Sequence, residues 1–320
     1  MQQSPSPKTN RVEREPREAP IEGDVVNRIG NTPLIPLRKI SRATPGVTLL
    51  AKAEWFNPGG SVKDRAAANI IASAEEAGLL TRDKILLDAT SGNTGVAYAM
   101  IGTAKGYTVK LCVPSNAAAE ILKSLRAFNA EIVLTSPLES SDGAIREARR
   151  LAAQEPDKYF YADQYNNPAN WQAHYKTTGP EIWEQTEGSV THFVAGLGTS
   201  GTLMGTGRRL KEYSKGIQVV SVQPDSPLHG LEGLKHMATS IVPGIYDPSL
   251  ADLNIPVRTE EAYGNVKRLA AEEGLLVGIS AGAALTAGLT IARQVKKGVI
   301  VMIFPDGGSR YLDEEFWKQQ

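Results

Sequence analysis

Lys63 occupies a position that is unusual for a lysine. It follows a Pro-Gly-Gly turn in the segment NPGGSVKDR, residues 57–65, in which Ser61 is expected to be the N-cap of a helix. A cation in the first helical turn meets the positive end of the helix dipole, which lowers the pKa of the amine. Such an amine is a nucleophile and can form a Schiff base. The alternative is a solvated lysine beside Asp64 and Arg65.

A second turn, ATSGNTG at residues 89–95, joins an expected strand to an Ala-rich helix. Its backbone N–H groups, its hydroxyls and the amide of Asn93 would converge on one point, with the positive end of the helix dipole behind them. This arrangement suits a carboxylate or a phosphate group. The alternative is an ordinary helix-capping turn.

A third turn, GLGTSGTLMG at residues 196–205, satisfies the pattern G-x-G-x-x-G, and Asp225 follows a second expected strand. Taken alone, the pattern predicts a dinucleotide site in which Asp225 binds a ribose. The hydroxyls of the turn suit the oxygens of a terminal phosphate better than a pyrophosphate. Both interpretations predict that this turn binds phosphate.

Short β-branched segments alternate with segments of helical period along most of the chain. We expect strands at residues 48–55, 84–90, 108–114, 131–136, 191–198, 218–224 and 299–306. This alternation predicts an α/β fold with parallel sheets covered by helices. Residues 163–180 interrupt the pattern with Asn, Pro and Gly, which predicts the main domain junction.

The composition excludes several classes of protein. The length of 320 residues fits about two domains, and 35 Lys and Arg balance 35 Asp and Glu, so neither nucleic acid nor a membrane is an expected partner. Cys112 is the single cysteine, and we interpret it as a core residue of a cytoplasmic protein without disulfides or a metal site. Residues 1–20 are polar and rich in proline, which predicts a disordered tail.

The combination of NPGGSVKDR, TSGNTG, GLGTSGT, GISAGAA and an early IGNTPLIPL resembles the cysteine synthase (O-acetylserine sulfhydrylase) family of fold-type II pyridoxal-phosphate enzymes. The resemblance extends from about Ile29 to Tyr311. It implies a two-domain fold like that of the tryptophan synthase β subunit. It also implies that Lys63 binds pyridoxal 5'-phosphate covalently and acts as the catalytic residue.

The resemblance assigns the remaining site residues. The substrate carboxylate would be bound by Thr90, Ser91, Gly92, Asn93, Thr94 and Gln164, with Asn93 also contacting the ring hydroxyl of the cofactor. The cofactor phosphate would be bound by Gly198, Thr199, Ser200, Gly201 and Thr202; relatives often have glycine at the position of Ser200.

Ser280 would contact the ring nitrogen of the cofactor. A neutral hydroxyl there leaves the ring a weak electron sink, which favours β-elimination and β-replacement. Ser280 is also expected to be a helix N-cap.

The expected reaction converts O-acetylserine and sulfide to cysteine and acetate. Lys235, in GLKHM, matches an arginine of relatives that use O-phosphoserine, so this donor and a thiocarboxylated sulfur-carrier protein remain alternatives, as does cystathionine β-synthase activity. An NAD-dependent dehydrogenase would leave Lys63 and Ser280 without roles. The resemblance implies a homodimer, with a smaller mobile domain at residues 50–165 and a larger phosphate-binding domain at 21–49 plus 166–320.

Overall fold

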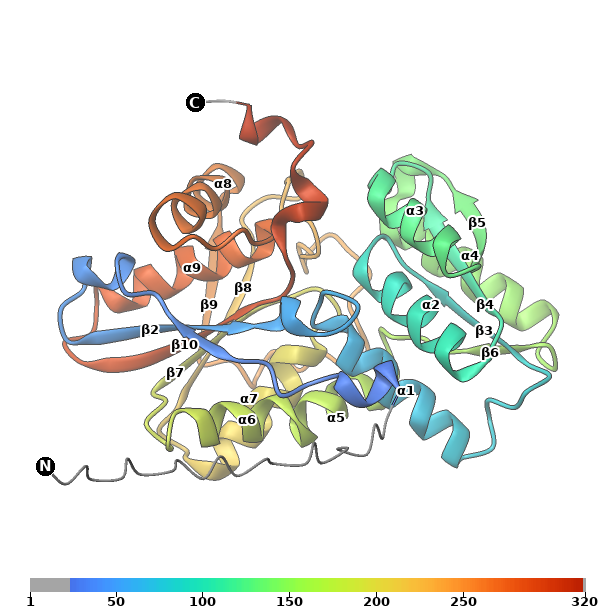
Figure 1. Cartoon of the computed structure of the whole chain (residues 1–320), viewed down its shortest axis with the longest axis horizontal. Helices are drawn as coiled ribbons and strands as arrows, with labels where there is room; N and C mark the ends of the chain where they lie inside the picture. The colour runs from blue at the N-terminus through green and yellow to red at the C-terminus, as the bar shows by residue number, and fades with distance from the viewer. Residues whose placement is uncertain (1–23, 319–320) are drawn as a thin grey trace, which may run out of the picture.

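The computed structural model describes residues 24–318, which form two largely parallel β-sheets with helices on both faces of each sheet (Figure 1). The expected tail at residues 1–20 lies outside the described residues. Within residues 24–318, no helix is both long and apolar enough to cross a membrane.

The larger sheet has the strand order β1-β2-β10-β7-β8-β9, and only β1 and β2 pair antiparallel. The strands are β1 (Leu34–Pro36), β2 (Val47–Ala53), β7 (His192–Gly196), β8 (Gln218–Pro224), β9 (Leu253–Val257) and β10 (Gly298–Phe304). The central strand β10 reads GVIVMIF, an apolar run of the kind that a sheet covered on both faces requires.

Helices cover the two faces of this sheet (Figure 1). Met302 packs with α8 (Thr259–Arg268) and α9 (Ile279–Ala292), whereas its neighbour Val301 packs with α6 (Thr178–Gln185) and α7 (Gly201–Tyr213). Successive strand residues point to opposite faces, so one apolar strand supplies both cores.

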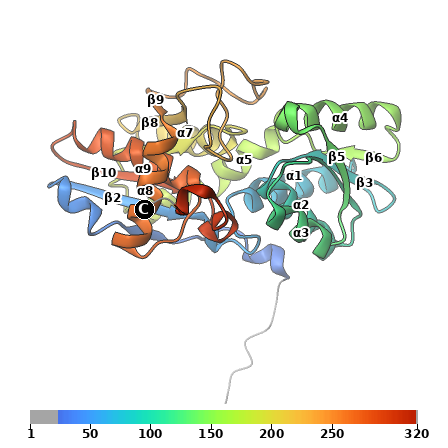
Figure 2. The ribbon, with the colours of Figure 1, turned by 90° about the horizontal axis from the view of Figure 1, so that it is seen from above.

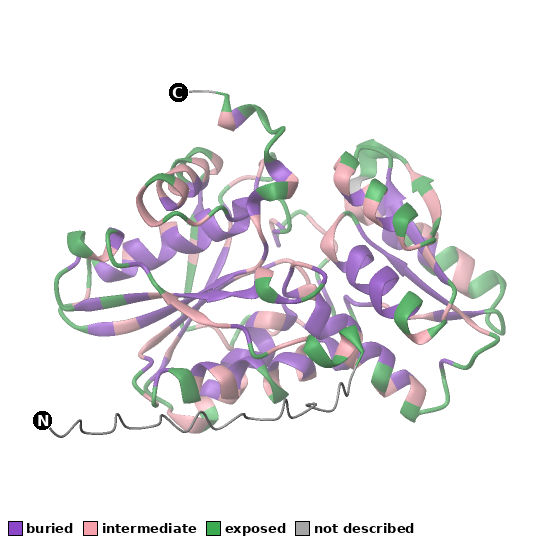
Figure 3. Ribbon diagram, viewed as in Figure 1, coloured by how far each residue is buried: buried purple, intermediate pink, exposed green. Residues whose placement is uncertain are grey.

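The smaller sheet has the strand order β5-β4-β3-β6, and each pair of neighbouring strands in it is parallel. Its strands are β3 (Ile85–Ala89), β4 (Val109–Pro114), β5 (Glu131–Thr135) and β6 (Tyr159–Tyr161). One core contains residues of α1 (Lys63–Glu76), α2 (Asn93–Lys105) and α3 (Ala119–Ala127), and α4 (Ser140–Gln154) covers the other face (Figure 2). Cys112 is buried under α4. Buried residues line the strands and the inner helix faces of both sheets (Figure 3).

Each expected strand is present, with ends that differ by a residue or two. The prediction missed β1, β6 and β9, which are all edge strands; β1 and β6 have only three residues each, too few to show a period. The stretch at residues 163–180, where we expected an interruption of the pattern, contains α5 (Pro168–Lys176) and the start of α6, and the prediction missed these helices. Asn167 caps α5 and Pro168 occupies its first turn, which are helix-start signals that resemble a loop in sequence. The domain boundaries and the mobility of the smaller domain stay predictions.

Gly205 offers a test of how closely the helices of the larger domain pack. It lies on α7, where a Cβ would overlap the backbone carbonyl oxygen of Trp171 on α5. We expect Gly205→Ala to lower the free energy of unfolding by roughly 1–3 kcal/mol, because the helices must move apart. Urea denaturation measures this change.

Gly264→Ala is the matched control, since this exposed glycine of α8 has nothing within 4 Å of its added Cβ. It should leave stability unchanged or raise it by about 0.5–1 kcal/mol. Equal effects of the two substitutions would contradict the close packing of α5 against α7.

Candidate active site

Two adjoining cavities lie where the strands of both sheets end. β3, β7 and β10 each run toward this region and are followed by the loops that line it. The carboxyl ends of parallel strands are the usual place for a ligand in an open α/β fold. The larger cavity has a volume of about 360 Å³, which a small substrate can occupy.

The structure brings nearly all of the predicted site residues to these cavities. Lys63, Asn93, Gly198, Thr199, Ser200, Thr202 and Ser280 line the smaller cavity, and Thr90, Ser91, Gly92, Thr94, Gln164 and Lys235 line the larger one. Gly201 lines neither cavity, because it is buried at the start of α7 against Asn170. Asp225, the ribose ligand of the dinucleotide interpretation, is exposed and also lies outside both.

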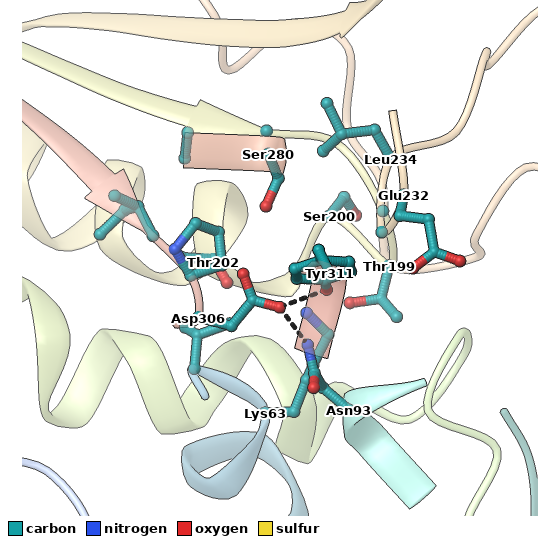
Figure 4. Close-up of a pocket in the computed structure, with 17 residues that line it drawn as sticks. Lys63, Asn93, Thr199, Ser200, Thr202, Glu232, Leu234, Ser280, Asp306 and Tyr311 are labelled. Carbon is teal, nitrogen blue, oxygen red and sulfur yellow. Dashed lines mark hydrogen bonds between the residues drawn. The ribbon is translucent and has the colours of Figure 1, made fainter. Parts of the chain in front are cut away.

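Lys63 is the first residue of α1 and projects into the smaller cavity (Figure 4). The predicted cap is wrong by one position, since Val62 is the N-cap; the Ser61 hydroxyl instead accepts a hydrogen bond from the backbone N–H of Lys63 (3.3 Å). Burial lowers the pKa of the Lys63 amine, while the carboxylates of Asp306 and Glu54 oppose this change. The pKa is lowered, as the sequence predicted, but burial and not the helix dipole is the main cause.

A buried ionic network fixes the start of α1. Arg65 donates from Nε to Glu54 Oε2 (2.7 Å) and from Nη1 to Glu181 Oε1 (2.6 Å). Glu181 also receives a hydrogen bond from the fully buried Lys52 (2.7 Å). The network joins α1 to the end of β2 and to α6. In the sequence, Lys63 lies between two members of the network, Glu54 and Arg65. Sequence reasoning missed it, because its members are far apart along the chain.

The turn between β7 and α7 has the features of a phosphate site. Ser200 adopts a left-handed backbone conformation (φ 70°) at the N-cap of α7, and its side chain makes no capping hydrogen bond. Its hydroxyl is buried without a hydrogen-bond partner. The Thr199 hydroxyl accepts one hydrogen bond from the backbone N–H of Gly201 (3.4 Å). A Cβ at Gly198 would overlap the carbonyl oxygen of Gly233, so this position requires glycine. The remaining N–H groups of the first turn and the unpartnered Ser200 hydroxyl fit the phosphate of a bound cofactor.

The turn between β3 and α2 is held in place by its own side chains and by Gln164, which follows β6. The Thr90 hydroxyl accepts from the backbone N–H groups of Gly92 (3.1 Å) and Gly95 (3.0 Å). Thr94 donates to Gln164 Oε1 (2.8 Å), and the Gln164 amide donates to the carbonyl of Ala89 (2.7 Å). These bonds leave the exposed Ser91 at the cavity wall and orient a turn that suits a carboxylate.

Ser280 lies in the first turn of α9, with its hydroxyl directed into the smaller cavity (Figure 4). Its expected capping role is wrong, because Gly278 is the N-cap of this helix. Its hydroxyl therefore remains available to a ligand in the cavity, as the ring-nitrogen role requires.

Asp306 is a site residue that sequence reasoning missed. It is 2% exposed, and its Oδ2 accepts hydrogen bonds from Asn93 Nδ2 (2.7 Å) and the Tyr311 hydroxyl (2.5 Å) (Figure 4). Burial raises the pKa of this carboxyl group, and its Oδ1 is buried without a partner. The sequence held one signal for this residue. Asp306 comes shortly after β10, an expected strand, just as two of the predicted binding turns come after the expected strands β3 and β7. The Asn93 side chain also accepts a hydrogen bond at Oδ1 from the Arg310 guanidinium.

Comparison with known proteins identifies the family. The model for the family described as pyridoxal-phosphate dependent enzyme matches residues 25–306. A cysteine synthase from Aquifex aeolicus is 52% identical, over 90% of this chain and 90% of the relative. The chain belongs to the cysteine synthase family of pyridoxal-phosphate dependent enzymes. The cavity features described above thus fit the cofactor of this family.

Solved structures of the family have the same fold. A crystal structure of cysteine synthase from Entamoeba histolytica has a TM-score of 0.89 and 35% identity, covering 100% of this chain and 95% of that one. An O-acetylserine-dependent cystathionine β-synthase from Helicobacter pylori has a TM-score of 0.87 and 32% identity, covering 93% and 99%. Fold-type II architecture and dependence on pyridoxal phosphate are therefore shown, and the dehydrogenase alternative is wrong.

The electrostatic effect of Asp306 on Lys63 predicts a pH effect. The Asp306 carboxylate raises the pKa of the Lys63 amine in the cofactor-free protein. Asp306→Asn should therefore shift the pH dependence of the rate at which pyridoxal phosphate binds, followed by its visible absorption, toward lower pH by up to about one unit. Spectrophotometric rate measurements over a range of pH give the midpoint.

Glu232→Gln is the control for this measurement. Glu232 lines the same cavity but is not among the charges that act on Lys63. Its substitution should leave the midpoint in place. An unmoved midpoint in Asp306→Asn, or an equal shift in both variants, would contradict the role given to Asp306.

Proposed function

We propose that this chain catalyses β-replacement, in which O-acetylserine and sulfide give cysteine and acetate. The observation that carries the proposal is the convergence of Lys63, the start of α7 and the turn at residues 90–94 on adjoining cavities. Membership of the cysteine synthase family supports the same reaction.

The bound cofactor would supply the electron withdrawal that makes the substrate α-proton acidic. Lys63 would bind the cofactor at rest and, once displaced by the substrate amine, take the α-proton and later return it. Its lowered pKa suits this role, because the neutral amine is the base. The turn at residues 90–94 would bind the substrate carboxylate and so fix the α-carbon near Lys63. The net change breaks the Cβ–O bond to acetate and forms a Cβ–S bond.

A second reaction deserves a direct test, because the Helicobacter pylori neighbour is an O-acetylserine-dependent cystathionine β-synthase. In that case homocysteine would replace sulfide as the nucleophile. The use of O-phosphoserine, a sulfur-carrier protein as the sulfur source, a homodimer and a cytoplasmic location stay predictions.

The reaction is tested by incubating the cofactor-loaded protein with O-acetylserine and either sulfide or homocysteine. We expect cysteine as the main product with sulfide, and loss of at least about 10³-fold of the turnover in Lys63→Ala, because the proton-transfer group is gone. Lys158→Ala, an exposed lysine paired with Glu155, is the control and should keep full turnover. Faster turnover with homocysteine, or an active Lys63→Ala variant, would contradict the proposal.

A further inference from the structure

Among the described residues, two lysines line the cavities, Lys63 and Lys235, and of these Lys235 is the one that forms an ion pair with another side chain. It belongs to the long connection between β8 and β9, lines the larger cavity, and its side chain is 8% exposed. Its backbone N–H donates to the carbonyl of Leu197 (2.7 Å), which fixes the chain at this point. The side chain therefore has little freedom to leave the cavity wall.

The partner of Lys235 is Asp142 on α4. Lys235 Nζ lies 2.9 Å from Asp142 Oδ1 and 3.3 Å from the Ser141 hydroxyl, with the ring of Tyr165 at 5.1 Å. The second carboxylate oxygen of Asp142 accepts from the backbone N–H of Ile241 (3.1 Å). Because both oxygens are occupied, the carboxylate is held in place beside the ammonium group.

This pairing changes the charge that a substrate meets. A phosphate ester of serine carries about −1.5 to −2 charge on the leaving group at neutral pH, whereas an acetyl ester carries none. A carboxylate at hydrogen-bond distance offsets most of the attraction of Lys235 for such an anion. Glu232 adds a further acidic side chain to the wall, although burial raises its pKa to about 7 so that it carries only part of a charge at neutral pH. No arginine lines either cavity among the described residues.

We propose that Asp142 is a specificity-determining residue: by neutralising Lys235 it makes the cavity favour O-acetylserine over O-phosphoserine. The inference rests on the proposed β-replacement reaction and names the donor that it uses. Lys235 alone would attract phosphate, as the sequence suggested, and Asp142 reverses that preference. The carboxylate acts through Lys235 and does not itself contact the reacting atoms.

The test measures kcat/KM for the two donors, with sulfide, in the cofactor-loaded wild type and in Asp142→Asn. Asparagine keeps an oxygen for the Ile241 N–H but removes the charge. The ratio of O-phosphoserine to O-acetylserine use should rise by about tenfold or more, because Lys235 becomes an unpaired cation. Inorganic phosphate should also become a stronger inhibitor, and added salt should reduce both effects.

Asp252→Asn is a closely matched control. Asp252 also pairs with a lysine, Lys211 (2.7 Å), and accepts from a backbone N–H, that of Val219 (2.7 Å), but it lines neither cavity. It should leave the donor ratio and the phosphate inhibition unchanged. If Asp142→Asn does not fold, Asp142→Ser removes the same charge and carries the same expectation.

The outcomes separate this inference from the proposed function. A wild type that turns over O-acetylserine, with an unchanged donor ratio in Asp142→Asn, overturns the role of Asp142 alone. A wild type that prefers O-phosphoserine also overturns it. Failure of the wild type with both donors contradicts the proposed function itself. A rise in the ratio that Lys235→Ala abolishes in the double variant supports the inference, since a purely structural role would not increase the use of an anion.

Discussion

The buried pairing of Arg65 with Glu54 and Glu181 is the constraint on which the site depends. Burying these charges is costly unless each is paired and hydrogen-bonded, and here the partners come from the end of β2, from α1 and from α6. The network therefore forms only when these elements meet in one arrangement. Arg65 is only two residues from Lys63 in α1. The same pairing therefore fixes the start of α1 and directs the Lys63 amine into the cavity.

Around this fixed amine, the two sheets contribute different chemistry. The larger sheet supplies the start of α7 and the Ser280 hydroxyl, which suit the cofactor, and the smaller sheet supplies the turn after β3, which suits a substrate carboxylate. Asp306 connects the two sheets, because it follows β10 of the larger sheet and accepts a hydrogen bond from Asn93 at the start of α2, which follows β3 of the smaller sheet. The ion pair of Lys235 with Asp142 makes a second connection between them. Residues that follow strands of both sheets line the substrate cavity, so substrate binding depends on how the two sheets are placed relative to each other.

Sequence alone was sufficient for the parts of this arrangement that are local. The strands with continuous apolar runs and the three glycine-rich turns were predictable, because periodicity and turn residues act over a few positions. Pairings between distant residues were not: nothing near Arg65 indicates Glu181, and nothing near Lys235 indicates Asp142. Edge strands such as β9 and the capped start of α5 were missed for a different reason, since their local signals are those of loops.

We propose that Lys63 is the amine that binds the cofactor, since it lines the smaller cavity beside the start of α7. Reduction of the pyridoxal-phosphate-loaded protein with borohydride, followed by peptide mass spectrometry, tests it most directly, because a reduced Schiff base remains on the lysine that formed it. We expect the pyridoxyl modification on the peptide that contains Lys63. Modification of Lys52 or Lys235 instead, or of no lysine, would contradict it.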